Sequence, residues 1–129
     1  MTKIILLLLL AVVSRNVLAE WVVEGENEDE VFYSSHESIR WKGGTVKMLV
    51  LLDKKKAQET ATGKKFMSVE VRNEFDCSAE KARMLYAYYY SDKNTKGDVL
   101  LRIDEPSNWM QVTPNSRDQA LWNVACGKE

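Results

Sequence analysis

Ser35, His36 and Glu37 stand side by side and carry the three side-chain types of a hydrolytic triad, namely a nucleophile, a general base and an orienting acid. Neighbours in an extended chain point to opposite sides, so these three cannot line up in that order unless the chain turns sharply. His36 is also the only histidine, which leaves no second imidazole for a zinc site. We therefore expect an exposed imidazole in a turn, and neither a catalytic centre nor a bound metal or cofactor.

The acidic stretch 24–30 has carboxylates that could bind calcium. Calcium loops of the EF-hand type space their oxygen ligands as D-x-[DN]-x-[DN]-G, and this stretch lacks that spacing. We expect a solvated acidic turn between two strands.

The two cysteines, Cys77 and Cys126, could form a disulfide. Residues 67–77 alternate between apolar and polar side chains, as a half-buried strand does, and Cys77 falls on the apolar side with Phe75. Cys126 ends a segment of helical periodicity. A bridge would restrict the unfolded chain by about 4 kcal/mol in the entropic model. Two buried thiols are the alternative, and an oxidising compartment favours the bridge.

The N-terminus indicates export. Lys3 precedes an unbroken apolar run over 4–13, and residues 17–19 match a small-residue cleavage site, so we expect residues 1–19 to be a signal peptide cut before Glu20. The alternative is a buried N-terminal helix. The apolar run is too short for a membrane helix, which needs roughly 20 residues. No cysteine lies near residue 20, so we expect no lipid anchor and a periplasmic or secreted protein.

The mature chain, residues 20–129, has the length of one domain. Cleavage removes two of the 18 basic residues and none of the 19 acidic ones, which lowers the formal net charge from −1 to −3. A mildly acidic surface has no general attraction for nucleic acid or anionic lipid, so we expect neither as a partner.

Periodicity predicts an α+β fold, an antiparallel sheet of about six strands with a C-terminal helix packed on one face and held by the disulfide. The helix should begin after Ser116, which forms a capping-box pattern with Gln119, and end before Gly127. The stretch 45–52 is apolar on both faces, which indicates a central strand covered on two sides, or at least a strand in the middle of the sheet. Asn73 interrupts an apolar face and suggests a bulge. The expected extended segments are 21–23, 31–33, 39–42, 45–52, 66–77, 83–91, 98–104 and 109–112.

Two surfaces are candidates for ligand binding. The first is a long polar loop over 53–65, whose lysines could hold polyanions such as heparin-like sugars or could simply be solvated. They are Lys54, Lys55, Lys56, Lys64 and Lys65. The second is the tyrosine strand, where Tyr86, Tyr88 and Tyr90 share a face. Tyrosine offers stiff, amphipathic contact area for a protein or glycan ligand, but it can equally fill space on a sheet.

One further pattern spans nearly the whole mature chain. It consists, in order, of Trp21, Tyr33, Ser38-Ile39, Gly44, an apolar strand over 46–52 followed by Asp53, Ser68, Glu74-Phe75-Asp76-Cys77, a tyrosine-rich strand, Trp109, Pro114 and Cys126. This pattern resembles the surface-adhesin protein E family of small exported bacterial proteins. The resemblance implies an antiparallel sheet, a C-terminal helix held by a disulfide, a Gram-negative source, and binding of host matrix proteins such as laminin and vitronectin.

The family includes a lipoprotein displayed on the outer membrane, and this sequence lacks the cysteine for that attachment. Two functions remain open. One is a non-enzymatic exported adhesin that binds a protein or glycan. The other is a soluble periplasmic domain that serves or scaffolds an envelope complex.

Overall fold

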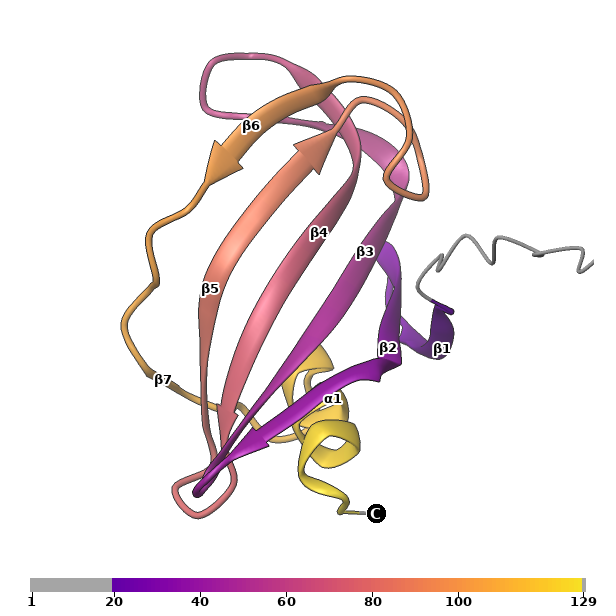
Figure 1. Ribbon diagram of the computed structural model, residues 1–129. Coiled ribbons are helices and arrows are strands. Elements are labelled where there is room, and N and C mark those ends of the chain that lie inside the picture. The colour runs from indigo at the N-terminus through magenta and orange to yellow at the C-terminus, as the bar shows by residue number, and fades with distance from the viewer. Residues whose placement is uncertain (1–19, 129) are drawn as a thin grey trace, which may run out of the picture.

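The structure is a computed structural model that describes residues 20–128, so the signal peptide predicted over residues 1–19 lies outside the described residues. Within that range, six consecutive strands pair antiparallel in sequence order, and a short seventh strand pairs with the fifth (Figure 1). The predicted α+β architecture, an antiparallel sheet of about six strands with a C-terminal helix, is confirmed. The elements are β1 (Val22–Glu26), β2 (Glu30–Lys42), β3 (Thr45–Glu59), β4 (Lys65–Asp76), β5 (Lys81–Tyr90), β6 (Val99–Ile103), the short β7 (Met110–Gln111) and α1 (Arg117–Cys126).

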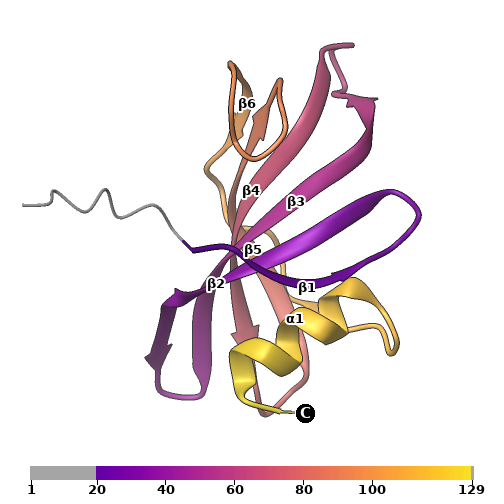
Figure 2. The ribbon, with the colours of Figure 1, turned by 90° about the vertical axis from the view of Figure 1, so that its right-hand side faces the viewer.

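Helix α1 packs against one face of the sheet only. It lies behind the sheet in Figure 1, and the turned view of Figure 2 places it on one side of the strands. We call this side the helix side and the opposite side the open face. The predicted apolar sets of β3 and β4 point to the helix side and form the core with α1. Its members include Val46, Met48, Val50, Leu52, Val69, Val71, Phe75, Leu121, Trp122 and Ala125.

The disulfide between Cys77 and Cys126 joins the end of β4 to the last turn of α1, as predicted. The Trp122 indole reinforces this junction by donating to the Asp76 carbonyl at 2.9 Å. At the helix start, the Ser116 hydroxyl accepts from the Gln119 N–H at 3.2 Å. The Gln119 side chain bonds Asn123 instead of the cap, so only half of the predicted capping box forms.

The helix ends as expected at Gly127, whose φ of 67° is left-handed. None of the helices among residues 20–128 is long and apolar enough to cross a membrane.

A single long strand, β2, replaces the two short strands predicted over 31–33 and 39–42. Its pairing with β3 shifts between Ser35 and Arg40, so the extra residues bulge out of the ladder. The Ser38 hydroxyl fills the gap: it donates to the Ser35 carbonyl at 2.6 Å and accepts from the Leu49 N–H at 2.8 Å. A side chain thus supplies the hydrogen bonds that the interrupted ladder lacks, which keeps the strand continuous.

The polar loop predicted over 53–65 is wrong, because β3 continues as a strand to Glu59. Its far end pairs with β4 again, Gln58 opposite Phe66, after an irregular stretch that follows Asp53. The loop proper is confined to residues 60–64. The apolar–polar alternation that predicts a strand is absent here because most of these residues are charged. Whether a charged side chain is buried depends on its partners elsewhere in the chain, which local periodicity does not reveal.

β3 lies in the middle of the sheet, as predicted, but the helix covers only one of its faces, so the alternative of a strand covered on two sides is not found. Leu51 points to the open face, away from the core cluster, yet only 1% of it is exposed. Its cross-strand neighbours are Tyr33 on β2 and Glu70 on β4, which flank it on the sheet. Leu51 is therefore shielded from solvent by the large side chains of the neighbouring strands and not by a second layer of structure.

The bulge suspected at Asn73 is present, and its extra residue lies on the partner strand. Arg72 pairs with Tyr86 and Asn73 with Met84, so Leu85 of β5 has no partner on β4. The predicted strap over 109–112 packs through Val112, which is buried, while Met110 is largely exposed.

Candidate ligand-binding surfaces

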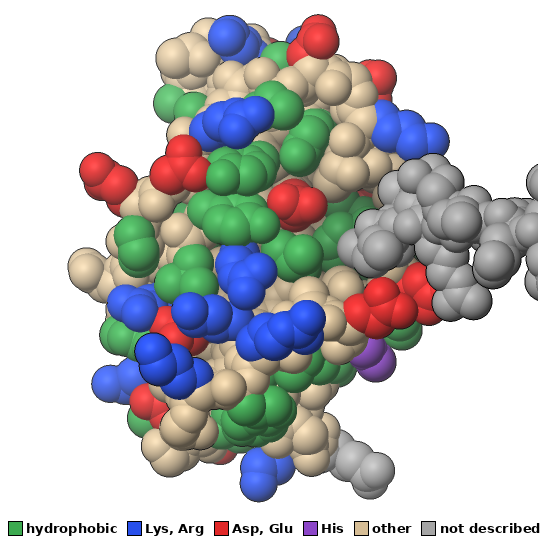
Figure 3. Space-filling view, viewed as in Figure 1, with side chains coloured by type: hydrophobic (Ala, Val, Ile, Leu, Met, Phe, Trp, Pro, Cys, Tyr) green, Lys and Arg blue, Asp and Glu red, His purple; other side chains and the backbone are tan. Residues whose placement is uncertain are grey.

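The three tyrosines singled out from the sequence lie on the open face, where no helix covers them. The β4–β5 register sets Tyr88 opposite Glu70 and Tyr86 opposite Arg72, and Arg102 on β6 lies opposite Tyr88. We call the group Tyr86, Tyr88, Tyr90, Glu70, Arg72 and Arg102 the tyrosine face. In Figure 3, which views this side, hydrophobic side chains spread over the upper half of the molecule with basic and acidic groups among them.

The aromatic rings of this face are held in fixed positions. Tyr86 and Tyr88 stack with their ring centroids 4.5 Å apart and their planes 18° apart. The Arg102 guanidinium lies over the Tyr88 ring at 5.1 Å. The Tyr88 hydroxyl donates to Asp104 at 2.7 Å, and this bond raises the pKa of Tyr88 by favouring its protonated form. Tyr86 and Tyr88 thus form a preorganised aromatic surface, and such preorganisation would lower the entropic cost of binding a ligand.

Glu70 adds a carboxylate to the tyrosine face at a position where burial disfavours its charged form. Burial raises its pKa, and the hydrogen bond from the Tyr86 hydroxyl, 3.4 Å long, offsets only part of that rise. The acceptor capacity of this carboxylate is therefore available to donors on a ligand.

The loop between β5 and β6 forms a wall at one end of the open face. Ser68, which is fully buried, donates to the Asp92 carbonyl at 2.6 Å and accepts from the Thr95 N–H at 2.9 Å. Asp53 accepts from the Asn94 N–H at 3.0 Å. These hydrogen bonds hold the loop across the end of the sheet. The loop therefore forms a fixed boundary of the tyrosine face.

The five lysines of the first candidate surface do not form one group. Lys54 is only 8% exposed and turns to the helix side, where it pairs with the buried Glu30. Lys55 pairs with Glu26 of β1 at 3.3 Å. Lys56 is exposed on β3, and Lys64 and Lys65 are exposed where the chain enters β4.

Ser35 and His36 lie on opposite sides of β2, as their spacing predicts. The His36 ring contacts Glu24 of β1 at 2.8 Å, and the neighbouring Ser34 hydroxyl donates to the same carboxylate oxygen at 2.8 Å. The carboxylate thus lies between hydroxyl and imidazole, whereas a triad needs the imidazole between the other two. The predicted exposed imidazole is found, within the β2 bulge rather than in a turn.

The sequence argument missed Glu30, which it placed in a solvated turn. Glu30 begins β2 and is 2% exposed. Its two oxygens accept from Lys54 and from Arg117, the latter at 2.8 Å. Burial alone would raise its pKa, but the two hydrogen bonds and the two positive charges outweigh burial and lower it. Arg117 is 87 residues away along the chain, so no local pattern could have revealed this cluster.

Comparison with known proteins decides the family. The family model of surface-adhesin protein E matches residues 21–127. The chain belongs to the surface-adhesin protein E family. It is thus related to exported surface adhesins, and the resemblance seen in the sequence is confirmed.

Solved structures of Haemophilus influenzae protein E share the fold. Crystal form II is 15% identical, with a TM-score of 0.65 over 87% of this chain and 91% of that chain. A second structure is 16% identical, with a TM-score of 0.62 over 87% of each. Protein E from a non-typeable strain is 15% identical, with a TM-score of 0.59 over 88% of this chain and 79% of that one. No curated protein matches significantly in sequence.

Proposed function

We propose that this protein is an exported, non-enzymatic adhesin that binds a host matrix protein of the laminin or vitronectin class on its tyrosine face. The family supplies the adhesin role, and the uncovered sheet face carries the choice of surface. Tyrosine and arginine are enriched where protein interfaces gain most of their binding energy. The tyrosine face supplies Tyr86 and Tyr88 as rigid anchors, with Arg72 and Arg102 beside them.

Purified mature protein should bind immobilised laminin or vitronectin in surface plasmon resonance. Replacing both Tyr86 and Tyr88 by alanine should weaken binding by about 30-fold or more, the loss expected when a hot spot worth about 2 kcal/mol is removed. The matched control replaces Lys64 and Lys65, the exposed members of the other candidate surface. Circular dichroism should show that both variants fold.

The outcomes separate the alternatives. If only the lysine variant loses binding, the surface assignment is wrong and the basic hairpin is the site. If neither matrix protein binds at micromolar concentration, the host-matrix role is lost. Protease accessibility on intact cells then tests location, because a protein that is cut only after the outer membrane is opened would be a periplasmic accessory domain instead.

A further inference from the structure

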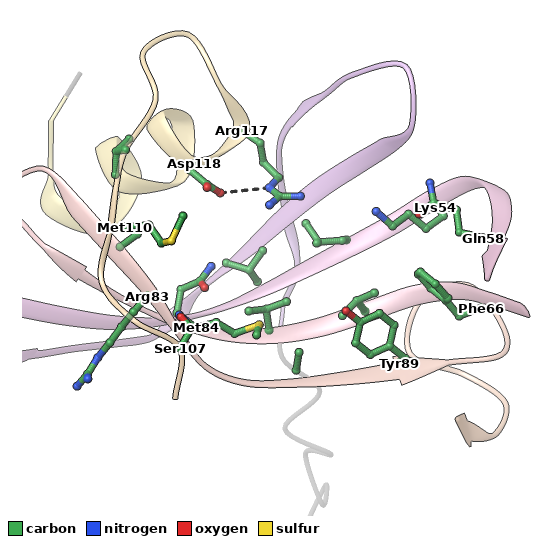
Figure 4. Close-up of a pocket in the computed structure, with 18 of the residues that line it drawn as sticks. Lys54, Gln58, Phe66, Arg83, Met84, Tyr89, Ser107, Met110, Arg117 and Asp118 are labelled. Carbon is green, nitrogen blue, oxygen red and sulfur yellow. Dashed lines mark hydrogen bonds and ion pairs between the residues drawn. The ribbon is translucent and has the colours of Figure 1, made fainter. Parts of the chain in front are cut away.

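A cavity of about 390 Å³ lies on the helix side of the sheet, opposite the tyrosine face. Its floor is formed by the inward residues of β3, β4 and β5, and its walls by the strap around β7 and the first turn of α1 (Figure 4). This volume is within the range of small-molecule sites, about 300–1,000 Å³. Along β4 the lining runs from Phe66 to Asn73, roughly 23 Å at about 3.3 Å per residue. The cavity is therefore a trough that suits an elongated molecule.

The floor of the trough is apolar. It is lined by Val50, Leu52, Val69, Val71, Ala87 and Tyr89. At one end the Phe66 and Tyr89 rings meet edge to face, with their centroids 4.8 Å apart. Aliphatic floor and aromatic end match a flexible hydrocarbon chain, whose burial contributes about 0.8 kcal/mol per methylene.

Three cations line the same trough, but Arg83 pairs with Glu74 at 2.7 Å and lies over the Trp109 ring, so Lys54 and Arg117 are the two considered for a ligand. Lys54 reaches it from β3 and Arg117 from α1, and Figure 4 shows both beside the apolar floor. Among the described residues, Glu30 accepts one hydrogen bond from each, and Asp118 accepts from Arg117 Nε at 3.3 Å. Lysine has three donors and arginine five, so both have donors to spare.

The hydrogen-bond donors at this end of the trough outnumber the bonds that its carboxylates accept. Lys54 pairs with Glu30, and Arg117 pairs with both Glu30 and Asp118, so the formal charges balance while most donors of the two cations stay free for a ligand. The Arg117 side chain is 35% exposed, so a ligand carboxylate can reach its remaining donors and accept charge-assisted hydrogen bonds from them.

From this arrangement we propose that the trough binds a single-chain amphiphile with a carboxylate head group, a free fatty acid. The hydrocarbon chain lies along β4 on the apolar floor. The carboxylate accepts the spare donors of Lys54 and Arg117. The site is on the other side of the sheet from the tyrosine face, and it does not depend on the adhesin proposal.

Titration calorimetry of the processed protein with three probes of equal chain length tests this assignment. The probes are dodecanoate, dodecanol and dodecyltrimethylammonium, each below its micelle concentration. Dodecanoate should bind at least about ten-fold more tightly than the other two, as expected for hydrogen bonds to a charged group. Lys54→Met should remove this preference and leave dodecanol binding unchanged, whereas Lys56→Met, an exposed lysine of the same strand, should keep it. Ala87→Phe, which narrows the floor, should weaken all probes that bind.

The proposal is overturned if dodecanoate does not bind, if the cationic probe binds equally well, or if neither Lys54→Met nor Arg117→Met lowers the preference for dodecanoate. Retained dodecanol binding shows that the trough of each variant is intact. Tyr88→Ala serves as the opposite-face control and should leave all three affinities unchanged. A loss of dodecanoate binding in that variant would place the site on the open face and overturn the assignment.

Discussion

Glu30→Gln should destabilise the protein by about 3 kcal/mol, because it leaves two cations facing each other without their shared carboxylate. Breaking a buried ion pair by removing one partner costs about 3–5 kcal/mol. The lower end applies here, since the side chains of Glu30 and Lys54 are 3% and 10% exposed but that of Arg117 is 35% exposed. For a domain of this size the thermal midpoint should fall by roughly 12 °C.

The pH dependence of this loss has a definite sign. The folded-state pKa of Glu30 is below the ordinary value of 4.5, so its ionised form stabilises the fold. That contribution is fully present above about pH 4.5 and is lost as the pH falls through the lowered folded-state pKa. The wild type and Glu30→Gln should therefore differ most near neutral pH and converge in acid.

Urea unfolding followed by tryptophan fluorescence measures both effects, since Trp122 lies buried in the core. The matched control is Glu37→Gln, an exposed glutamate of the same strand, and it should change stability by less than about 0.5 kcal/mol. Equal stability of Glu30→Gln and wild type at pH 7 would refute the reasoning. So would two stability curves that remain parallel down to pH 3.

Three further predictions concern the fold. Replacing Cys77 and Cys126 by serine should cost about 4 kcal/mol, the entropic value for a bridge across a separation of 49 residues; a urea-unfolding difference below about 1 kcal/mol would contradict it. Glu70→Gln should raise the thermal midpoint at pH 7, because burial raises the folded-state pKa of Glu70 and its ionised form costs stability at every pH above that value; a lower midpoint would be the contrary result. Gly25→Ala should cost about 1–3 kcal/mol, since an added Cβ would lie 2.6 Å from the buried Phe32 ring, whereas Gly44→Ala, which meets nothing within 4 Å, is its calorimetric control.

Local periodicity was enough to predict the core, and the reason is geometric. Val69, Val71 and Phe75 alternate with polar residues along β4, so one face of the strand must be buried wherever the strand is placed. The same parity placed Cys77 on the helix side. The bounds of the helix could also be predicted from local sequence, because Ser116 caps its N-terminus and Gly127 takes the left-handed conformation that ends it.

Long-range compensation is what the sequence could not reveal. Lys54 lies in a run of charged residues that suggests a solvated loop, yet Glu30, 24 residues earlier, allows it to be buried. The sequence predicted the composition of the tyrosine face but not its exposure. The shared side of Tyr86 and Tyr88 followed from their spacing, but whether that side met a helix or solvent depended on the position of α1.

The two sides of the sheet carry different kinds of information about ligands. This chain and Haemophilus influenzae protein E share a fold at 15% sequence identity. A ligand contacts particular residues, so shared topology does not identify the partner. The alternation along β4 separates the residues that hold the fold from those that could contact a ligand. Val69 and Val71 pack in the core, whereas Glu70 and Arg72 lie on the opposite face, where they can differ without changing the core. If the ligand binds the tyrosine face, substitutions at Glu70, Arg72, Tyr86 and Tyr88 should alter recognition and leave the core unchanged. Substitutions at Ala82 and Met84 should not share this effect, because the bulge at Leu85 turns both side chains toward the core.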